Sequence, residues 1–568
     1  MSQQQQPQPL PLPDLASTYQ ELYRARILAD AQAGITTPFV VPFHLLAYWI
    51  VPTLYLALPH RGRPWLYRAR WLVLAFVCVF NWHMVRHVTS PNFAVSYGVG
   101  LVAAWTTIWS FTLLVWTRPQ WDAKRVERRR RVEPEPKCNG PTNVTQARTD
   151  ENDKVDGVRS RAAHARLCVA AIENTKDAED TADIAPAMAE LRRLAQVQEY
   201  EYYWQAFPAD ASFRTRLGWA FDIVSSFRLT GWNWAPSCLP PYEPPPRIGP
   251  YQLPLQYGQH KTRQGYERTL SRRDYIISRW LFNFVPGYIV VDLCGTLMTA
   301  DPYFIVGPEH NYPLPAHLAS LHPITLSLQR TMLAFVAIYF ALQYAWYFGT
   351  IWLALCGPPV LGFRAHPWHL PSLTGSFTQV LDHGLSGFWG AWWHQTFRVG
   401  FSAPTKWLQR HGYLPLSRQG PKKIMTLFAG AIIAFAQSGV IHGAGSYTSA
   451  SAATRCLHPP LFFMLSGLGT ILQSVLSHLL RHRIEKCPRW LRRLGNLAFT
   501  VLWLWATGWA LLDDFGRSGL WLWEPVPISF ARAAGLGVDR RVWRFDEFSL
   551  PRWQWGSRGR WWETGIVI

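Results

Sequence analysis

The sequence is poor in charged residues and in cysteine. Asp, Glu, Lys and Arg make up 16% of its 568 residues, and this low share argues against an ordinary soluble enzyme, because soluble domains carry roughly 25%. Its 8 cysteines include no Cys-x-x-Cys pair, which excludes a small disulfide-rich scaffold and gives no thiolate zinc motif. We therefore expect no metal site and no bound cofactor.

Long apolar runs stand where charge is missing. A helix that crosses a bilayer needs about 20 mostly apolar residues. Eight stretches approach or reach that length, at about 39–58, 71–88, 93–116, 275–297, 332–356, 424–447, 460–480 and 496–512. We therefore predict an all-α polytopic membrane protein with about eight (seven to nine) transmembrane helices. A large soluble protein with buried helices is the alternative interpretation.

The net charge is +20, and the Lys and Arg residues are distributed unevenly along the chain. Lys and Arg gather after the first, third, fifth and seventh apolar stretches, whereas the loops between them, 89–92, 301–331 and 448–459, are nearly free of them. Cytoplasmic loops of membrane proteins show this enrichment, so the pattern predicts a multi-pass topology with membrane lipids as neighbours. No helix-turn-helix, zinc-finger or RRM pattern occurs, and we expect no nucleic-acid partner.

A histidine stands inside one of the apolar stretches. His442 lies in FAQSGVIHGAGSY, with Ser438 and several glycines around it. A polar side chain inside a membrane span is energetically expensive and is therefore a functional hypothesis by default. The small residues let a substrate or a neighbouring helix approach closely. The alternative is a histidine that bonds a carbonyl within a helix interface.

A second histidine follows a cluster of tryptophans. The segment LSGFWGAWWHQTFR holds His394 and Gln395 directly after Trp389, Trp392 and Trp393. Such a segment suits an amphipathic or re-entrant stretch at the membrane surface. A belt of tryptophans that only anchors the interface is the alternative.

These two segments carry a family resemblance. FWGAWWHQTFR resembles the FWxxxWHQxFR signature of the wax-synthase-like branch of the membrane-bound O-acyltransferases, and SGVIH resembles the SGxxH segment that follows it there. Upstream, RLGWAFDIVSSFRLTGWNW resembles an element of the fungal-type acetyltransferases of secondary metabolism. The sequence departs from the common pattern at Ala391 and Trp392, where basic residues are frequent, which leaves the acyl-donor contacts there open.

The resemblance implies a helix bundle that encloses a chamber, in which an acyl group passes from a CoA thioester to a hydroxyl. His442 is then the general base, because a neutral imidazole accepts the proton of an attacking alcohol. The thioester carbonyl becomes an oxyanion and needs a hydrogen-bond donor, which His394 or Gln395 would supply. Trp389, Trp393, Ser438, Arg398 and Lys422 are the expected substrate-binding residues, the last two toward CoA phosphates; the positive-inside rule alone also explains these two cations.

The expected reaction is acetyl transfer from acetyl-CoA to a hydroxyl of a terpenoid or related secondary metabolite, in the endoplasmic reticulum membrane. Acyl-CoA and a lipophilic alcohol are therefore the expected partners, with the acyl-CoA as cosubstrate. A long-chain wax-ester synthase is the alternative within the class. A transporter is the alternative outside it, although no internal repeat of the kind common in transporters is evident.

The two histidines are not obviously close. In a straight helix that starts at Ile424, His442 lies about 27 Å along the axis, toward the side opposite the basic loops, whereas His394 falls on a basic loop. Either the 385–398 segment dips deeply into the membrane, or the helix starts later or tilts.

Composition and resemblance together divide the chain into five parts. We expect a disordered Gln/Pro-rich N-terminus at 1–35, three transmembrane helices at 36–117, a polar and partly disordered cytosolic insertion at 118–200, an acyltransferase domain at 201–513, and a tail at 514–568. Residues 183–206 suit an amphipathic helix at the membrane surface. A ninth membrane segment near 520–530 would explain the arginines of the tail.

Overall fold

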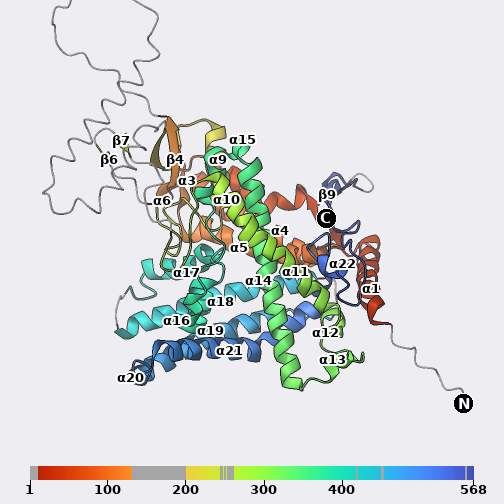
Figure 1. Cartoon of the computed structure of the whole chain (residues 1–568). Helices are drawn as coiled ribbons and strands as arrows, with labels where there is room; N and C mark the ends of the chain where they lie inside the picture. The colour runs from red at the N-terminus through yellow and green to blue at the C-terminus, as the bar shows by residue number, and fades with distance from the viewer. Residues whose placement is uncertain are drawn as a thin grey trace, which may run out of the picture.

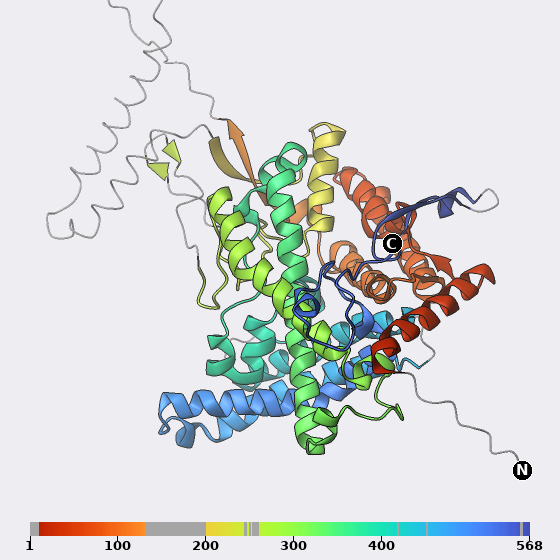
Figure 2. The same ribbon diagram turned by 45° about the vertical axis from the view of Figure 1, so that its right-hand side comes forward.

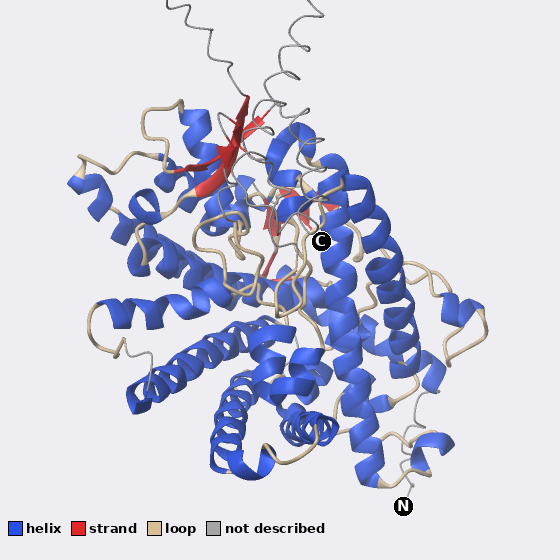
Figure 3. Cartoon of the chain, turned by 60° about the vertical axis from the view of Figure 1, so that its left-hand side comes forward, coloured by secondary structure: helices blue, strands red, loops and turns tan. Residues whose placement is uncertain are grey.

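The structure is a computed structural model that describes residues 11–130, 200–242, 247–248, 251–252, 261–416, 420–449, 453–556 and 560–567. Helices dominate it, and the strands are short and peripheral (Figures 1 and 3). The predicted all-α polytopic fold is confirmed. Most of the predicted insertion, residues 131–199, lies outside the described residues, as do residues 1–10 of the N-terminus.

The helices of the described residues follow one another as α1 (Leu12–Gln32), α2 (Val51–Ala57), α3 (Pro64–Arg68), α4 (Arg70–His87), α5 (Phe93–Phe111), α6 (Pro119–Asp122), α9 (Phe213–Ser225), α10 (Arg272–Arg279), α11 (Val285–Met298), α12 (Pro302–Val306), α13 (Ala316–Ala319), α14 (Pro323–Cys356), α15 (Pro358–Leu361), α16 (Thr378–Gly387), α17 (Arg398–Arg410), α18 (Gly420–Thr448), α19 (His458–Leu479), α20 (Arg481–Ile484), α21 (Arg489–Arg517) and α22 (Phe530–Ala533). The helices α18, α19 and α21 lie side by side, and α14 crosses this layer steeply (Figures 1 and 2).

Short strands tie distant parts of the chain together. They are β1 (Thr37–Pro38) with β3 (Val88–Thr89), β2 (Val40–Val41) with β9 (Gly565–Val567) and β8 (Arg552–Gln554), β4 (Arg125–Arg130) with β5 (Tyr200–Gln205), and β6 (Arg247–Ile248) with β7 (Tyr251–Gln252). The first pair is parallel and the others are antiparallel. The helix expected at 183–206 is wrong for residues 200–205, because these are rich in aromatic side chains, which favour strands, and they pair with β4 instead.

Six helical segments are long and apolar enough to cross a membrane, by length and composition, among the described residues. They are Phe93–Trp116, Arg272–Met298, Pro323–Cys356, Met425–Thr448, His458–Leu479 and Arg489–Arg517. Each coincides with one of the eight predicted stretches, and several begin earlier than predicted; α14, for example, starts at Pro323, where the His322 side chain accepts a hydrogen bond from the backbone of Ile324. These spans support a multi-pass membrane protein.

The first two predicted stretches are helical but fall outside these six. The first forms only the shorter apolar helix Phe43–Ala57. The second is α4, which contains polar residues such as Asn81 yet exposes large apolar side chains, among them Leu72 at 75% and Trp82 at 64%. An apolar face without protein neighbours is what lipid contact requires. Of the three membrane helices predicted at 36–117, only the last is thus among the six segments of spanning length.

The N-terminus is more ordered than its composition suggested. Disorder was expected for residues 1–35, but α1 is helical from Leu12 and buries Leu15 and Ile27. Its Tyr23 ring packs edge-on against Phe93 at 5.8 Å. The Gln/Pro run that prompted the expectation ends where α1 begins, and proline is tolerated in the first turn of a helix.

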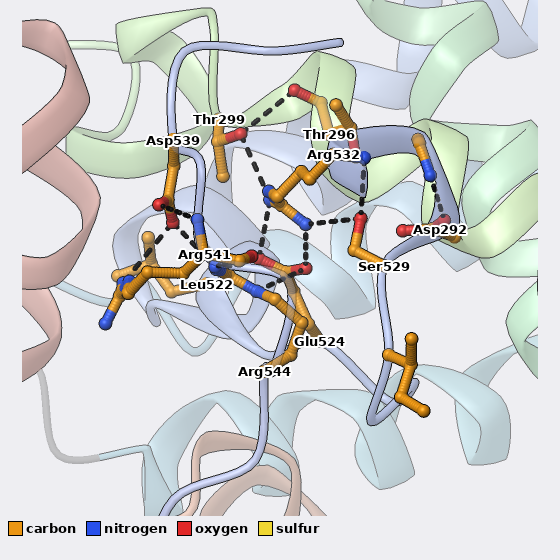
Figure 4. Close-up of polar contacts among 12 residues, drawn as sticks. Asp292, Thr296, Thr299, Leu522, Glu524, Ser529, Arg532, Asp539, Arg541 and Arg544 are labelled. Carbon is orange, nitrogen blue, oxygen red and sulfur yellow. Dashed lines mark hydrogen bonds and ion pairs between the residues drawn. The ribbon is translucent and has the colours of Figure 1, made fainter. Parts of the chain in front are cut away.

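The C-terminal tail folds back onto the bundle. No helix of spanning length occurs at 520–530, where a single 3-10 turn, Leu520–Leu522, is followed by extended chain, so the ninth membrane segment is not formed. The tail is held by what we name the C-terminal ion cluster, formed by Glu524, Arg532, Asp539 and Arg544 (Figure 4). Arg532 and Arg544 of the tail are therefore used in internal ion pairs, a use that is independent of the topology rule.

Candidate active site

His442 lies where three helices meet. Gly443 of α18 faces α19, and a Cβ there would come within 3.0 Å of the Pro460 side chain. Gly445 faces α5, where the ring of Tyr97 occupies the space that a side chain would need. The glycines predicted to permit close approach therefore do so, and they bring α5 and α19 against the turn that carries His442.

Tyr97 is the polar neighbour of His442. Its buried hydroxyl donates to the backbone carbonyl of His442 at 3.1 Å, and the same oxygen lies 3.4 Å from the ring nitrogen Nδ1. Because the single hydroxyl proton is used on the carbonyl, the oxygen is left to accept a proton from Nδ1–H. This arrangement favours the tautomer in which Nε2 carries the free electron pair, the form that a general base requires.

The 388–398 segment is fixed by its own side chains. The Gln395 amide donates to the carbonyls of Trp389 at 2.9 Å and Trp393 at 2.7 Å. Its oxygen accepts from Arg398 at 2.8 Å, and Arg398 also donates to the carbonyl of Gly390 at 2.7 Å. Both amide protons of Gln395 are thus used inside the segment, and the geometry favours a positioning role for Gln395 and Arg398.

His394 is presented by this fixed segment. Its ring lies between the rings of Trp393, at 5.4 Å, and Phe397, at 5.7 Å. Its Nδ1 atom is buried and has no hydrogen-bond partner in the described part of the chain. Burial, followed by the charges of His442 and Arg228, lowers the pKa of His394 to about 3. His394 is therefore neutral at physiological pH and retains one N–H group that can donate to a substrate oxygen.

Aromatic contacts join the two histidines into one site. Phe463 of α19 stacks on the His442 ring at 4.7 Å and also contacts Trp389 at 5.9 Å. Trp393 stacks on Phe388 at 5.6 Å. The 385–398 segment therefore reaches the depth of His442, which resolves the separation expected from the straight-helix estimate. We name His442, His394, Tyr97, Phe463 and Trp389 the two-histidine site.

The structure describes the side chains of some of the other predicted binding residues but not of all. Ser438 lies one turn before His442 on α18 and is half-buried. Lys422 belongs to the first turns of α18, whose side chains lie outside the described residues. Trp389 keeps a buried indole N–H without a partner among the described residues. The roles of these side chains toward substrates stay predictions.

A kink in α16 sets the direction in which the chain enters the 388–398 segment. Gly384 in α16 has a φ of 60°, and a Cβ there would lie 2.0 Å from the Gln473 amide nitrogen. Gln473 of α19 accepts a hydrogen bond from the backbone of Leu385 at 2.7 Å. Asp382, just before the kink, forms a two-point ion pair with Arg493 of α21 at 2.7 and 2.9 Å. Only glycine allows this turn without strain, and it directs the following residues toward His442.

Sequence reasoning missed Tyr97, Phe463 and Arg228. Tyr97 had a usable signal, since a tyrosine inside an apolar span usually finds a hydrogen-bond partner. Phe463 had none, because its position depends on helix packing, whereas Arg228 lies in the RLGWAFDIVSSFRLTGWNW segment of the resemblance, from which no role was drawn for it. No group of three or more His, Cys, Asp or Glu that could hold a metal occurs among the residues described.

The features so far define a polytopic α-helical membrane protein with a buried two-histidine site. Residues 370–465 match the Membrane bound O-acyl transferase family, and this range includes both histidines and Phe463. The chain therefore carries a segment of that family, and the resemblance seen in the sequence is confirmed at this level. The wax-synthase-like branch stays a prediction.

One curated relative matches part of the chain. Acetyltransferase ataH of Aspergillus terreus is 30% identical over 150 residues, which are 25% of this chain and 43% of that protein. The match thus spans less than half of the relative's length. No solved structure matches the chain. Together the family and the relative support a membrane-bound O-acyltransferase.

Proposed function

We propose that the protein is an integral-membrane O-acyltransferase that moves acetyl from acetyl-CoA to a hydroxyl of a terpenoid or related secondary metabolite, in the endoplasmic reticulum membrane. The observation that carries the proposal is the orientation of His442 by Tyr97, with His442 and His394 both inside the family-matching segment. The acetyltransferase relative supports the choice of acetyl.

The chemistry needs one base and one oxyanion donor. The acceptor hydroxyl bonds to Nε2 of His442, which takes the proton while the oxygen attacks the thioester carbonyl carbon. The oxyanion of the tetrahedral intermediate accepts a hydrogen bond from His394. The C–S bond then breaks, and the proton held by His442 passes to the departing CoA thiolate, so that the ester and CoA-SH leave and both histidines return to their starting state.

Burial suits both histidines to these tasks. An imidazolium is disfavoured in apolar surroundings, so His442 begins the reaction without a proton on Nε2. The ring of Phe463 stacked on it removes water from one face. A site set among long apolar spans suits an acceptor that partitions into lipid, which is why we propose a lipophilic alcohol as the acceptor class.

The test is acyl transfer in microsomes that contain the full chain. Labelled acetyl-CoA and palmitoyl-CoA are each offered with a panel of terpenoid alcohols and fatty alcohols. We expect labelled ester from acetyl-CoA and a terpenoid alcohol, and a loss of at least about 10²-fold in His442→Ala, the low end for removal of a general base. Microsomes with His482→Ala, an exposed histidine, serve as the matched control.

Three results would change the proposal. Ester formation only from palmitoyl-CoA and a fatty alcohol would select the wax-ester alternative. Full activity of His442→Ala would remove His442 from the mechanism. No transfer from either donor to any acceptor by the wild-type chain would contradict the enzyme itself and leave transport as the remaining alternative.

A further inference from the structure

Arg228 is a buried cation that forms no ion pair with any described residue. It lies in the turn after α9, and 5% of the residue is exposed. Its Nη1 atom donates to the carbonyl of Ser372 at 3.0 Å. Its Nε and Nη2 atoms are buried and make no hydrogen bond to any described residue. A buried charge left unpaired is strongly destabilising, so a position that keeps one calls for an explanation beyond folding.

Two aromatic rings hold the guanidinium in place. Its central carbon lies 5.4 Å from the ring centre of Tyr266 and 5.4 Å from that of Trp346. The next residue, Leu229, has a φ of 46°, an uncommon value outside glycine. Cation–π contacts stabilise the charge, but they leave the N–H groups along the Nε–Nη2 edge unused.

Other arginines of this chain show what that edge binds. In three of them Nε and Nη2 together hold the two oxygens of one carboxylate, at 2.7–3.0 Å: Arg330 with Asp301, Arg493 with Asp382, and Arg517 with Glu309. This two-point geometry matches a pair of anionic oxygens. Arg228 offers the same edge, buried from water, with no anion of the described chain on it.

Arg228 is connected to the segment that carries His394 through its neighbours Tyr266 and Ser372. The ring of Tyr266 packs against Arg228, and the Tyr266 hydroxyl donates to the carbonyl of Trp393 at 3.2 Å. Trp393 is the residue directly before His394. Ser372, the partner of Nη1, precedes Gly375, whose backbone N–H donates to Trp392 at 3.0 Å. Arg228 therefore lies behind the segment that presents His394.

We propose that the Nε–Nη2 edge of Arg228 binds an oxygen anion of the substrates beside His394. The anion is either the oxyanion that forms at the thioester carbonyl or a carboxylate carried by the acceptor. The CoA phosphates fit less well, because the pantetheine arm separates them from the reacting thioester. The inference rests on the proposed acyl transfer and adds an anion-binding residue to it.

The first experiment separates the two sources by kinetics. Wild type, Arg228→Met and Arg228→Lys are compared in microsomes with acetyl-CoA, a neutral terpenoid alcohol, a hydroxy acid and the methyl ester of that acid. If the edge binds the oxyanion, Arg228→Met lowers kcat roughly 10²-fold on every acceptor. If it binds an acceptor carboxylate, Arg228→Met raises KM roughly tenfold or more for the hydroxy acid alone, since a charged hydrogen bond is lost.

Arg228→Lys tests the shape of the edge. Lysine keeps the charge but lacks the planar fork. If a single oxyanion is bound, Arg228→Lys is expected to keep part of the kcat that Arg228→Met loses. If a carboxylate is held at two points, the KM of Arg228→Lys for the hydroxy acid is expected to be nearly as high as that of Arg228→Met. Wild-type kcat and KM for Arg228→Met on every acceptor would overturn the inference.

The second experiment does not depend on turnover. We compare the Tm of detergent-solubilised wild type, Arg228→Met and Arg330→Met. Arg330→Met lowers Tm, because it leaves Asp301 buried without its partner. Arg228→Met keeps or raises Tm, because no described carboxylate loses its partner when this charge is removed. A fall in Tm as large as that of Arg330→Met would show a structural cation and overturn the inference, even if no acyl transfer were found and the proposed function had failed.

Discussion

The C-terminal ion cluster and the two-histidine site both bury polar side chains, but they use them differently. In the cluster, Glu524 accepts from Arg532 at 2.7 Å and from Arg544 on the same carboxylate, and Arg544 continues to Asp539 at 2.6 Å (Figure 4). In the site, by contrast, His394 keeps a ring nitrogen and Arg228 keeps an edge without partners among the described residues.

This difference separates side chains that hold the fold together from side chains that can bind a substrate. Every charged group of the C-terminal ion cluster faces an opposite charge, although Nε of Arg532 has no partner among the described residues, so we assign the cluster to attachment of the tail. It reaches α11 through Arg532, which contacts Thr299 at the end of that helix, and the neighbouring Ala531 backbone donates to Asp292. Polar atoms that are buried and left free are destabilising, and they persist where a ligand satisfies them. The predictions below test this contrast from both sides.

The largest expected effect is on stability, in the cluster. Glu524→Gln removes the carboxylate between Arg532 and Arg544, both of which are almost fully buried. Breaking a buried ion pair costs about 3–5 kcal/mol, which should release the tail. We expect a lower Tm in detergent and early proteolysis after residue 520, with Glu547→Gln as the matched surface control because Glu547 is 73% exposed. An unchanged Tm would contradict a holding role.

The next effect is on catalysis, in the site. His394→Ala removes the neutral N–H donor and leaves the 388–398 segment held by Gln395 and Arg398. Loss of one oxyanion donor lowers kcat by roughly 10²-fold, with partial activity left because His442 remains. Tm should stay close to that of wild type. A large fall in Tm with unchanged kcat per folded protein would assign His394 to structure instead.

The third prediction concerns acid stability of the cluster. Burial alone would raise the pKa of Asp539, but hydrogen bonds from the Arg541 backbone and the Arg544 side chain lower it to about 2. A carboxylate with a depressed folded pKa stabilises fully above its unfolded pKa, near 4, and loses this contribution as pH falls through about 2. The linked stabilisation is about 2 kcal/mol.

The measurement is tail release by limited proteolysis between pH 4 and pH 2, with an acid-active protease. Wild type should become progressively more sensitive over this range. Asp539→Asn should be sensitive already at pH 6 and change little below it. Equal pH dependence in both proteins would show that Asp539 does not control the attachment.

The same contrast explains what was predictable from sequence. The spans were visible because lipid and helix length constrain every position of a long apolar run, and the two histidines stood out within recognisable segments. Tyr97 and Phe463 belong to other helices, so their contacts with His442 depend on how α5 and α19 pack. The order of α1 and the attachment of the tail depend on pairs such as Arg24 with Asp546, hundreds of residues apart. No local pattern announces such pairs.

The smallest effect is expected for Tyr97→Phe, which tests how the base is oriented. The change removes one hydroxyl and keeps the ring that packs against Gly445 and Phe515. The Nδ1 and carbonyl groups of His442 lose their shared partner. A net hydrogen bond is worth about 0.5–1.5 kcal/mol, so we expect kcat to fall roughly tenfold while KM for acetyl-CoA is unchanged.

The matched control is Tyr55→Phe, a buried hydroxyl on α2 that bonds the carbonyl of Leu66 at 3.1 Å. Both variants lose one buried hydrogen bond, so their Tm values should fall by similar amounts, but only Tyr97→Phe should lose kcat. Because the hydroxyl selects one tautomer of His442, the kcat of Tyr97→Phe falls at every pH at which His442 is neutral. Equal kcat in the two variants would mean that packing by Phe463 alone orients the base.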